Sequence, residues 1–320
     1  MEIMNANAYD AVKDSQKVMV QSPYKLYPGE DLVRIPAEKW GYVDAAPEDI
    51  EILRMINRYL FMTSKLLTIA MNNAGWNIDD LAVKKRLKFM ADKGVIARYR
   101  FVTDTGRSSY LVYKLDVKGR AIIARAASEN GRMITYTDKI TDSKNVEAVK
   151  RILAVNQCLI TCFTGAEAAD GGSGWETVTG SMVTDAPADK KAHRIFRATG
   201  LAHRPGESII IEAVRRGSNS ADEFAKKLKR INDTLAHKTF TGIDKDRVTV
   251  YVIAEDKEHM EEITELVRDI PRDSCNLAVT YDTGIFDGSN DITKLPGCKR
   301  RNILDRIRES LGMVTGKKTA

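Results

Sequence analysis

The spacing of apolar residues predicts three helices between positions 47 and 93, with two strands after them. In each helix the apolar side chains recur every three or four residues, as a single buried face requires. Thr63 and Asn77 stand where the second and third helices need caps, and Gly75 and Gly94 follow those helices. The apolar positions are Ile52, Leu53, Ile56 and Leu60, then Leu66, Leu67, Ile69 and Ala70, then Leu81, Val83, Leu87, Phe89 and Met90.

Beyond Gly94 the pattern changes to the alternation that is typical of strands. Arg98 and Arg100 alternate with aromatic residues, residues 103–107 have the composition of a turn, and a second strand follows over 109–115. Three helices and a hairpin predict a winged helix-turn-helix, in which the third helix is free to enter a DNA major groove. We place this domain at residues 45–135, after an extended arm over residues 1–44.

Positive charge is concentrated in this predicted domain. From Lys84 to Arg120 the sequence has eleven Lys or Arg residues against three Asp, a net of +8, whereas the whole chain carries +6. Such a local excess is expected of a nucleic-acid interface, so we predict double-stranded DNA as the partner. The alternative is a solvated basic helix on a domain that binds protein. The predicted DNA-binding residues are Lys84, Lys85, Arg86 and Lys88 on the third helix, and Arg98, Arg100 and Arg107 in the hairpin.

Residues 140–290 show a different order of elements: a helix, three strands, a helix, a strand, a helix and a last strand. Strands are expected at 175–183, 195–202, 208–214, 248–254 and 275–281. A meander followed by β-α-β crossovers forms a mixed sheet with helices on both faces. This αβββαβ order is that of the restriction-endonuclease-like, or PD-(D/E)XK, core. The expected fold class is therefore α+β or α/β, and residues 291–320 form a basic tail.

Short motifs in the second domain carry a family resemblance. The segment Ile209-Ile-Ile-Glu-Ala-Val-Arg-Arg-Gly217 precedes a helix with Lys226-Lys-Leu-Lys-Arg230, and Leu153-Ala-Val-Asn156 lies in the opening helix. Over residues 48–282 the chain resembles the replication-relaxation family. Members of that family pair an N-terminal winged helix with an endonuclease-like domain and occur on plasmids and conjugative elements. The resemblance implies a relaxase or a replication protein as a further partner.

The second domain matches an endonuclease active site only in part. A site of this class has an Asp after a Pro before the third strand, where this chain has Pro205-Gly206-Glu207. Glu212 fits the acid of the third strand, but Val214 replaces the lysine that would orient the attacking water. We therefore expect a domain that does not cleave DNA. The alternative is a metal-dependent nuclease that uses Glu176, Glu207 and Glu212, with Glu212 as ligand to Mg²⁺ or Mn²⁺.

Glu212 also has a plain structural interpretation. A lone acid on an apolar strand can pair with a nearby cation, and Arg215, Lys226 and Lys229 are the candidates. The four cysteines lack the spacing of a zinc site and are expected to be core thiols. No other cofactor is predicted.

Composition describes a soluble, two-domain protein. The chain has 320 residues, of which 43% are hydrophobic and 29% charged. No apolar run approaches the roughly 18 residues of a membrane helix, and the start lacks a signal pattern. We therefore predict a cytoplasmic protein with no membrane partner.

Three functions follow from these features. The first is a DNA-binding accessory protein of a mobile element, which acts in replication, mobilisation or regulation through its winged helix. In this hypothesis the second domain is a platform for structural support, for homodimer formation or for a docked partner. The second function is the metal-dependent nuclease. The third is a transcription repressor whose second domain senses a small ligand.

Overall fold

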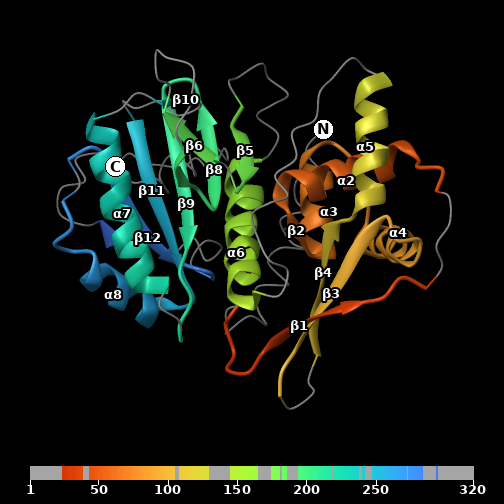
Figure 1. Cartoon of the computed structure of the whole chain (residues 1–320), viewed down its shortest axis with the longest axis horizontal. Helices are drawn as coiled ribbons and strands as arrows, with labels where there is room; N and C mark the ends of the chain where they lie inside the picture. Colours follow the sequence, from red (N-terminus) through yellow and green to blue (C-terminus); the bar gives the residue numbers. More distant parts are fainter. Residues whose placement is uncertain are drawn as a thin grey trace, which may run out of the picture.

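The computed structural model describes residues 24–38, 43–104, 108–129, 145–164, 174–180, 182–185, 194–217, 220–237, 240–241, 247–271, 273–283 and 293–294. These ranges form N-terminal helices with a small antiparallel sheet, followed by a larger mixed sheet with helices (Figure 1). The mixture of helices and sheets predicted from the sequence is thus confirmed. None of the helices in the described ranges has the length and apolarity needed to cross a membrane.

Within the described residues, the N-terminal unit has four helices around a four-stranded antiparallel sheet in the order β1-β3-β4-β2. Its first strand belongs to the segment expected to be an extended arm, and it pairs with the hairpin along its whole length. In chain order the elements are β1 (Asp31–Ile35), α2 (Pro47–Tyr59), β2 (Phe61–Met62), α3 (Ser64–Asn73), α4 (Asp80–Asp92), β3 (Ile96–Val102), β4 (Ser108–Leu115) and α5 (Val117–Glu129).

Local sequence explains where the helices of this unit begin and end. The side chain of Thr63 accepts a hydrogen bond from the Leu66 amide at 3.2 Å, as the predicted cap requires. The third helix begins later than predicted, because Asp79 rather than Asn77 caps it by accepting from the Ala82 amide at 2.7 Å. Gly94 ends that turn with a φ of 69°, a conformation that favours glycine.

The second unit is built on a mixed sheet in the order β13-β12-β11-β9-β8-β5. β9, β11 and β12 are parallel to one another, and β5, β8 and β9 are antiparallel. A smaller sheet has the order β10-β6-β7. The elements are α6 (Val146–Phe163), β5 (Glu176–Thr179), β6 (Met182–Asp185), β7 (Arg194–Arg197), β8 (Gly200–Arg204), β9 (Glu207–Ala213), α7 (Ser220–His237), β10 (Phe240–Thr241), β11 (Val248–Ala254), α8 (Lys257–Leu266), β12 (Asn276–Tyr281) and β13 (Thr293–Lys294).

Two strands predicted as continuous are each divided between the large and the small sheet. The predicted strand 175–183 breaks at Gly180, whose φ is 72°, and the predicted strand 195–202 breaks near Thr199. The Gly180 amide donates to the Thr199 carbonyl at 2.8 Å, so the two segments leave the large sheet at the same point. The residues on both sides of each break are typical of strands, which is why the sequence pattern alone does not reveal the break.

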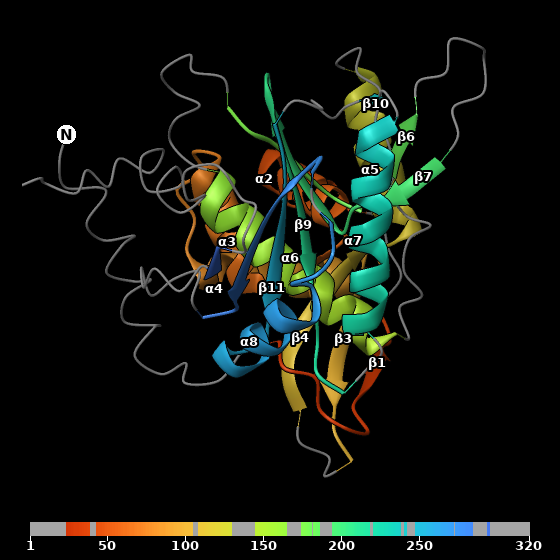
Figure 2. The same ribbon diagram turned by 90° about the vertical axis from the view of Figure 1, so that its left-hand side faces the viewer.

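Helices cover both faces of the large sheet (Figure 2). On β9 the side chains of Ile209 and Ile211 belong to the core on the α6 side, whereas Ile210 belongs to the core beneath α7 and α8. Gly200 allows α6 to lie close to β8, because a Cβ at this position would be 2.3 Å from Val155 Cγ1. Cys158, Cys162 and Cys275 are buried, as the sequence predicted; Cys298 lies outside the described residues.

The two units share α6 as a common wall, and one apolar core runs from the N-terminal helices to α6 (Figure 1). Asn156, which belongs to one of the motifs quoted above, is fully buried at this junction. Its Nδ2 donates to the carbonyls of Tyr59 and Phe61 at 2.8 and 2.7 Å, and its Oδ1 accepts from Thr179 Oγ1 at 2.5 Å. A single amide thus satisfies polar groups from both units.

Candidate nucleic-acid interface

The helix α4 buries one face and presents the other to solvent. Val83, Leu87 and Met90 recur at helical spacing and are at most 1% exposed, so they attach the helix to the core. The opposite side of the helix carries no cover from any described element. Its exposed residues are Leu81, Lys84, Lys85, Lys88 and Phe89.

The lysines on this face differ in how far they are neutralised. Lys84 Nζ lies 2.5 Å from Asp80 Oδ2 one turn earlier, and both side chains are substantially exposed. Neither Lys85 nor Lys88 forms an ion pair with any residue in the described part of the chain. Two cations are therefore available on the exposed face, and a third has only a solvent-exposed partner, which contributes little to stability.

Arg86, predicted as a DNA contact, points to the neighbouring helix instead. Its Nη1 lies 2.9 Å from Asp49 Oδ1 and its Nη2 lies 3.6 Å from Glu48 Oε2. Both acids belong to the first turn of α2, and Asp49 is 6% exposed. The guanidinium thus fixes α4 against α2, so it positions the exposed lysines and is not itself part of their face.

The predicted hairpin residues also divide into inward and outward groups. Arg98 Nη2 lies 3.5 Å from Asp92 Oδ1, and its side chain is only 13% exposed, so it ties the end of α4 to β3. Arg100 is exposed, and the strand register places it between Val33 on β1 and Leu111 on β4. Arg107 lies outside the described residues. Of the seven predicted DNA contacts, Lys84, Lys85, Lys88 and Arg100 face solvent.

Two apolar residues on α4 were assigned to the wrong face by the sequence pattern. Leu81 is 61% exposed and Phe89 is 48% exposed. Both were counted with the buried residues because they are apolar and close in sequence to the core positions. The signal that separates them is their phase: Val83, Leu87 and Met90 form a complete i, i+4, i+7 series, and the two exposed residues fall outside it.

The structure does not bring together the three carboxylates of the predicted nuclease site. Glu176 lies on the edge strand β5, is 77% exposed and pairs with His203 Nε2 at 3.1 Å. Glu207 is at the turn between β8 and β9, where its Oε2 accepts from Arg204 Nη2 at 2.9 Å. Glu212 is five positions further along β9, on the opposite face and roughly 17 Å away along the strand. Within the described ranges no group of three His, Cys, Asp or Glu side chains has the arrangement of a metal site.

Glu212 is completely buried in a network that satisfies both of its oxygens. Oε1 accepts from the Thr199 amide at 3.0 Å and from Lys227 Nζ at 2.6 Å, and Oε2 accepts from Thr199 Oγ1 at 2.7 Å. Arg151 Nη2 lies 3.6 Å from Oε2. The cations that pair with it are therefore Lys227 and Arg151, not the expected Arg215, Lys226 or Lys229. Burial alone would raise the pKa of Glu212, but Lys227 and Arg151 together hold the pKa below its usual value.

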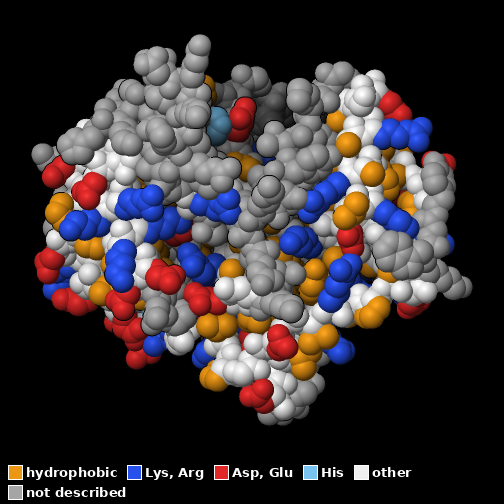
Figure 3. Space-filling view, in the orientation of Figure 1, with side chains coloured by type: hydrophobic (Ala, Val, Ile, Leu, Met, Phe, Trp, Pro, Cys, Tyr) orange, Lys and Arg blue, Asp and Glu red, His pale blue; other side chains and the backbone are white. Residues whose placement is uncertain are grey.

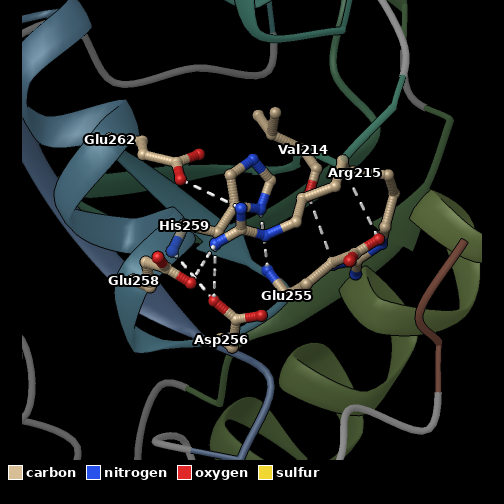
Figure 4. A network of polar contacts seen from close by, with 8 residues as sticks. Val214, Arg215, Glu255, Asp256, Glu258, His259 and Glu262 are labelled. Carbon is tan, nitrogen blue, oxygen red and sulfur yellow. Dashed lines mark hydrogen bonds and ion pairs between the residues drawn. The ribbon is translucent and has the colours of Figure 1, made fainter.

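A second charged network closes the carboxyl ends of the parallel strands (Figure 4). Arg215 and Asp282 follow β9 and β12, are both about 1% exposed and form an ion pair at 3.0 Å. The next residue, Arg216, pairs with three acids, one that caps α8 and two within that helix. The acids are Asp256 at 3.0 Å, Glu258 at 3.3 Å and Glu262 at 2.9 Å.

The same network contains a neutral histidine and a strand-end carboxylate. His259 Nδ1 accepts from the Glu255 amide at 3.2 Å, which fixes the orientation of its ring. Burial, with the Arg216 charge as the next cause, lowers the pKa of His259 to about 4. Glu255 Oε1 accepts from the amides of Leu26 and Arg216 at 3.0 and 3.3 Å. The strand ends, where open α/β sheets commonly bind ligands, are thus occupied by the protein's own side chains and by its N-terminal segment.

That N-terminal segment also joins the hairpin to α6. Lys150 on α6 is 2% exposed and donates to the Lys25 carbonyl and to the Glu30 carboxylate. Its ammonium lies 5.1 Å from the centre of the Phe101 ring on β3. The charges in this region therefore hold elements of the protein together.

Comparison with known proteins adds no relative to this picture. A scan against protein-family models finds no matching family, and searches of curated proteins and of solved structures find no similar protein.

Proposed function

We propose that this protein is a DNA-binding accessory protein of a plasmid or conjugative element, acting in replication, mobilisation or regulation. Its N-terminal unit is a winged helix-turn-helix, in which α4 enters the major groove and the β3–β4 hairpin is the wing. The observation that carries this proposal is the exposed face of α4, on which Lys85 and Lys88 have no described ion-pair partner. The assignment to a mobile element rests on the resemblance to the replication-relaxation family.

The order of elements supports the winged-helix assignment. A helix, a short strand, two helices and a hairpin follow one another, and the short strand β2 pairs with β4 of the hairpin. In this arrangement the last of the three helices packs on the core through one side only. The ion pairs of Arg86 with α2 and of Arg98 with the end of α4 hold this helix in place. Its lysines are therefore carried by a fixed helix. A fixed helix backbone does not have to be ordered when its lysines contact phosphates, which lowers the entropic cost of binding.

Lys and Arg side chains are also numerous beyond α4. They gather in a band across the face of the molecule seen in Figure 3, part of which lies over α7. On that helix Lys226, Lys229 and Arg230 are exposed, but exposed acids, Asp222, Glu223 and Asp233, accompany them. The proposal therefore assigns DNA binding to α4 and treats α7 as a solvated surface, which makes α7 a matched control.

The binding experiment compares two variants with equal loss of charge. Fluorescence anisotropy with labelled duplex DNA measures the parent protein, Lys84→Ala/Lys85→Ala/Lys88→Ala on α4, and Lys226→Ala/Lys229→Ala/Arg230→Ala on α7. We expect the α4 variant to lose at least tenfold in affinity and the α7 variant to retain most of it, because only α4 contacts phosphates. An α4 variant that binds DNA as tightly as the parent would contradict the proposal. Equal losses in both variants would contradict the assignment to α4.

For the second unit we propose an endonuclease-like fold that acts as a platform and does not cleave DNA. The supporting observation is Glu212, whose two oxygens already accept hydrogen bonds from Thr199 and Lys227 in a completely buried site. Lys227 stands near the carboxylate where a nuclease would place the lysine that Val214 replaces, but it is engaged as a counter-ion. These residues do not fit a site for Mg²⁺ or Mn²⁺, because such a cation binds through accessible carboxylate oxygens and retains several waters.

Supercoiled plasmid tests this second proposal. We expect intact plasmid after incubation with pure protein and either Mg²⁺ or Mn²⁺. Nicking that disappears in Glu212→Gln while circular dichroism shows this variant to be folded, and that persists in the exposed-acid control Glu176→Gln, would overturn the proposal in favour of a nuclease centred on Glu212.

A further inference from the structure

We infer that Leu81 and Phe89 determine which DNA sequences α4 binds, by contacting the methyl groups of thymine in the major groove. This inference rests on the proposed DNA binding and deepens it by naming the readers and the base that they recognise. The observation is the unusual character of the exposed helix face, which combines large apolar side chains with lysines.

The two apolar side chains form a single stripe with a lysine between them. Leu81 is in the first turn of α4, and Phe89 is eight residues later, roughly 12 Å along the helix axis. Lys85 lies four residues from each of them, so all three share one side of the helix. Lys93 Nζ lies 6.0 Å from the centre of the Phe89 ring, which places a further cation at the same end of the stripe.

Folding of the N-terminal unit does not account for this stripe. Val83, Leu87 and Met90 already attach α4 to the core, and the exposed fractions of Leu81 and Phe89, 61% and 48%, show that about half or more of each residue remains in solvent. A helix face needed only for solubility would carry polar residues at these positions. Apolar residues that remain exposed on such a face have their surface available for a partner.

The charge beside the stripe identifies the kind of partner. Lys85 lies between the apolar side chains and Lys84 and Lys88 lie along one side of them, so an apolar groove on another protein would have to leave these charges unmatched or supply acids for each. A DNA duplex supplies phosphates along both edges of the groove. Within the groove the apolar group presented by a base edge is the C5-methyl of thymine, which aliphatic and aromatic side chains contact. A lysine-flanked apolar stripe therefore fits a site that contains A·T pairs.

The experiment removes those methyl groups from the DNA and leaves base pairing intact. Duplexes that bind the full-length protein are first selected from a random pool, and the best is synthesised again with deoxyuridine in place of thymidine. Burial of one methyl group corresponds to about a fourfold change in affinity, so we expect the deoxyuridine duplex to bind the parent protein several-fold to roughly tenfold more weakly. The variant Leu81→Ser/Phe89→Ser should bind the two duplexes equally.

A matched control comes from the second unit. Leu266 on α8 is 42% exposed, so Leu266→Ser also removes an exposed leucine without touching α4. This variant should distinguish thymidine from deoxyuridine as the parent does. The inference is overturned if the parent binds both duplexes equally, or if Leu81→Ser/Phe89→Ser still distinguishes them. Those outcomes leave DNA binding itself in place, whereas the absence of any selected duplex would instead contradict the proposed function.

Discussion

Charged side chains are exposed on α4 but buried and paired in the second unit. On α4 the lysines are exposed, and two of them have no described ion-pair partner. In the second unit Glu212, Arg215 and Asp282 are at most 1% exposed, and each is paired with an opposite charge. Exposed cations contribute little to folding and are available to a polyanion. Buried pairs are costly to desolvate and destabilising to break, so they fix how helices and strands meet.

The largest effect is expected where a buried partner is removed. Glu212→Gln keeps the shape of the side chain but leaves Lys227 and Arg151 next to a neutral group. Breaking a buried pair in this way costs about 3–5 kcal/mol, so the free energy of unfolding measured by urea denaturation should fall by that order. The control is Glu176→Gln, because Glu176 is 77% exposed and its replacement should change stability by less than about 0.5 kcal/mol. Similar stabilities for both variants would contradict a structural role of Glu212.

A smaller loss of stability is expected for Arg86→Ala than for Glu212→Gln, and none for the neighbouring variant Lys85→Ala. Arg86→Ala removes the ion pairs with Asp49 and Glu48 and should lower stability by about 1–2 kcal/mol, because Asp49 is left buried without its cation. Lys85→Ala should leave stability unchanged and weaken DNA binding severalfold. Urea denaturation measures the stability of both variants, and fluorescence anisotropy measures their affinity for DNA. An Arg86→Ala variant that keeps full stability and loses DNA binding would show that Arg86 belongs to the interface.

A separate pH dependence of stability is expected from His259. The pKa of His259 is lowered to about 4 in the folded protein, so the unfolded chain binds its proton more readily. The contribution of His259 is therefore fully present above its unfolded pKa, roughly 6.5, and is lost as the pH falls toward 4. Unfolding measured between pH 7 and pH 4 should show this loss.

The matched variant for this prediction is His259→Asn, which does not titrate in this range and has an oxygen that can accept from the Glu255 amide. The fall in stability between pH 7 and pH 4 should be smaller in the variant than in the parent. An unchanged pH profile would place the titration on another group. The pKa of Glu212 is also lowered in the folded protein, so its contribution to stability is likewise lost as the pH falls through its folded pKa.

Local patterns predicted most elements of the fold, because caps and periodicity act within a few residues. Thr63 marks a helix start, and Gly94 marks a helix end, by local chemistry alone. The break at Gly180 and Thr199 was missed, since it depends on a hydrogen bond between two strands that are far apart in sequence. Strand division between sheets is a property of the assembled protein.

The candidate sites were harder to predict for the same reason. The sequence identified Glu212 as the acid of interest but not Lys227 and Arg151, which approach it from different helices. It grouped Arg86 with Lys84 and Lys85, although Asp49 turns only Arg86 inward. Charge density can be read from a sequence, whereas the pairing that decides whether a charge is available depends on the fold.

The central claim, that the exposed lysines of α4 contact DNA phosphates, is tested most directly by the salt dependence of binding. Each phosphate contact contributes about 0.9 to the slope of log K against log salt concentration. If all three lysines contact phosphates, Lys84→Ala/Lys85→Ala/Lys88→Ala should reduce the magnitude of this slope by roughly 3, while the α7 control variant keeps the slope of the parent. An unchanged slope in the α4 variant would contradict the claim.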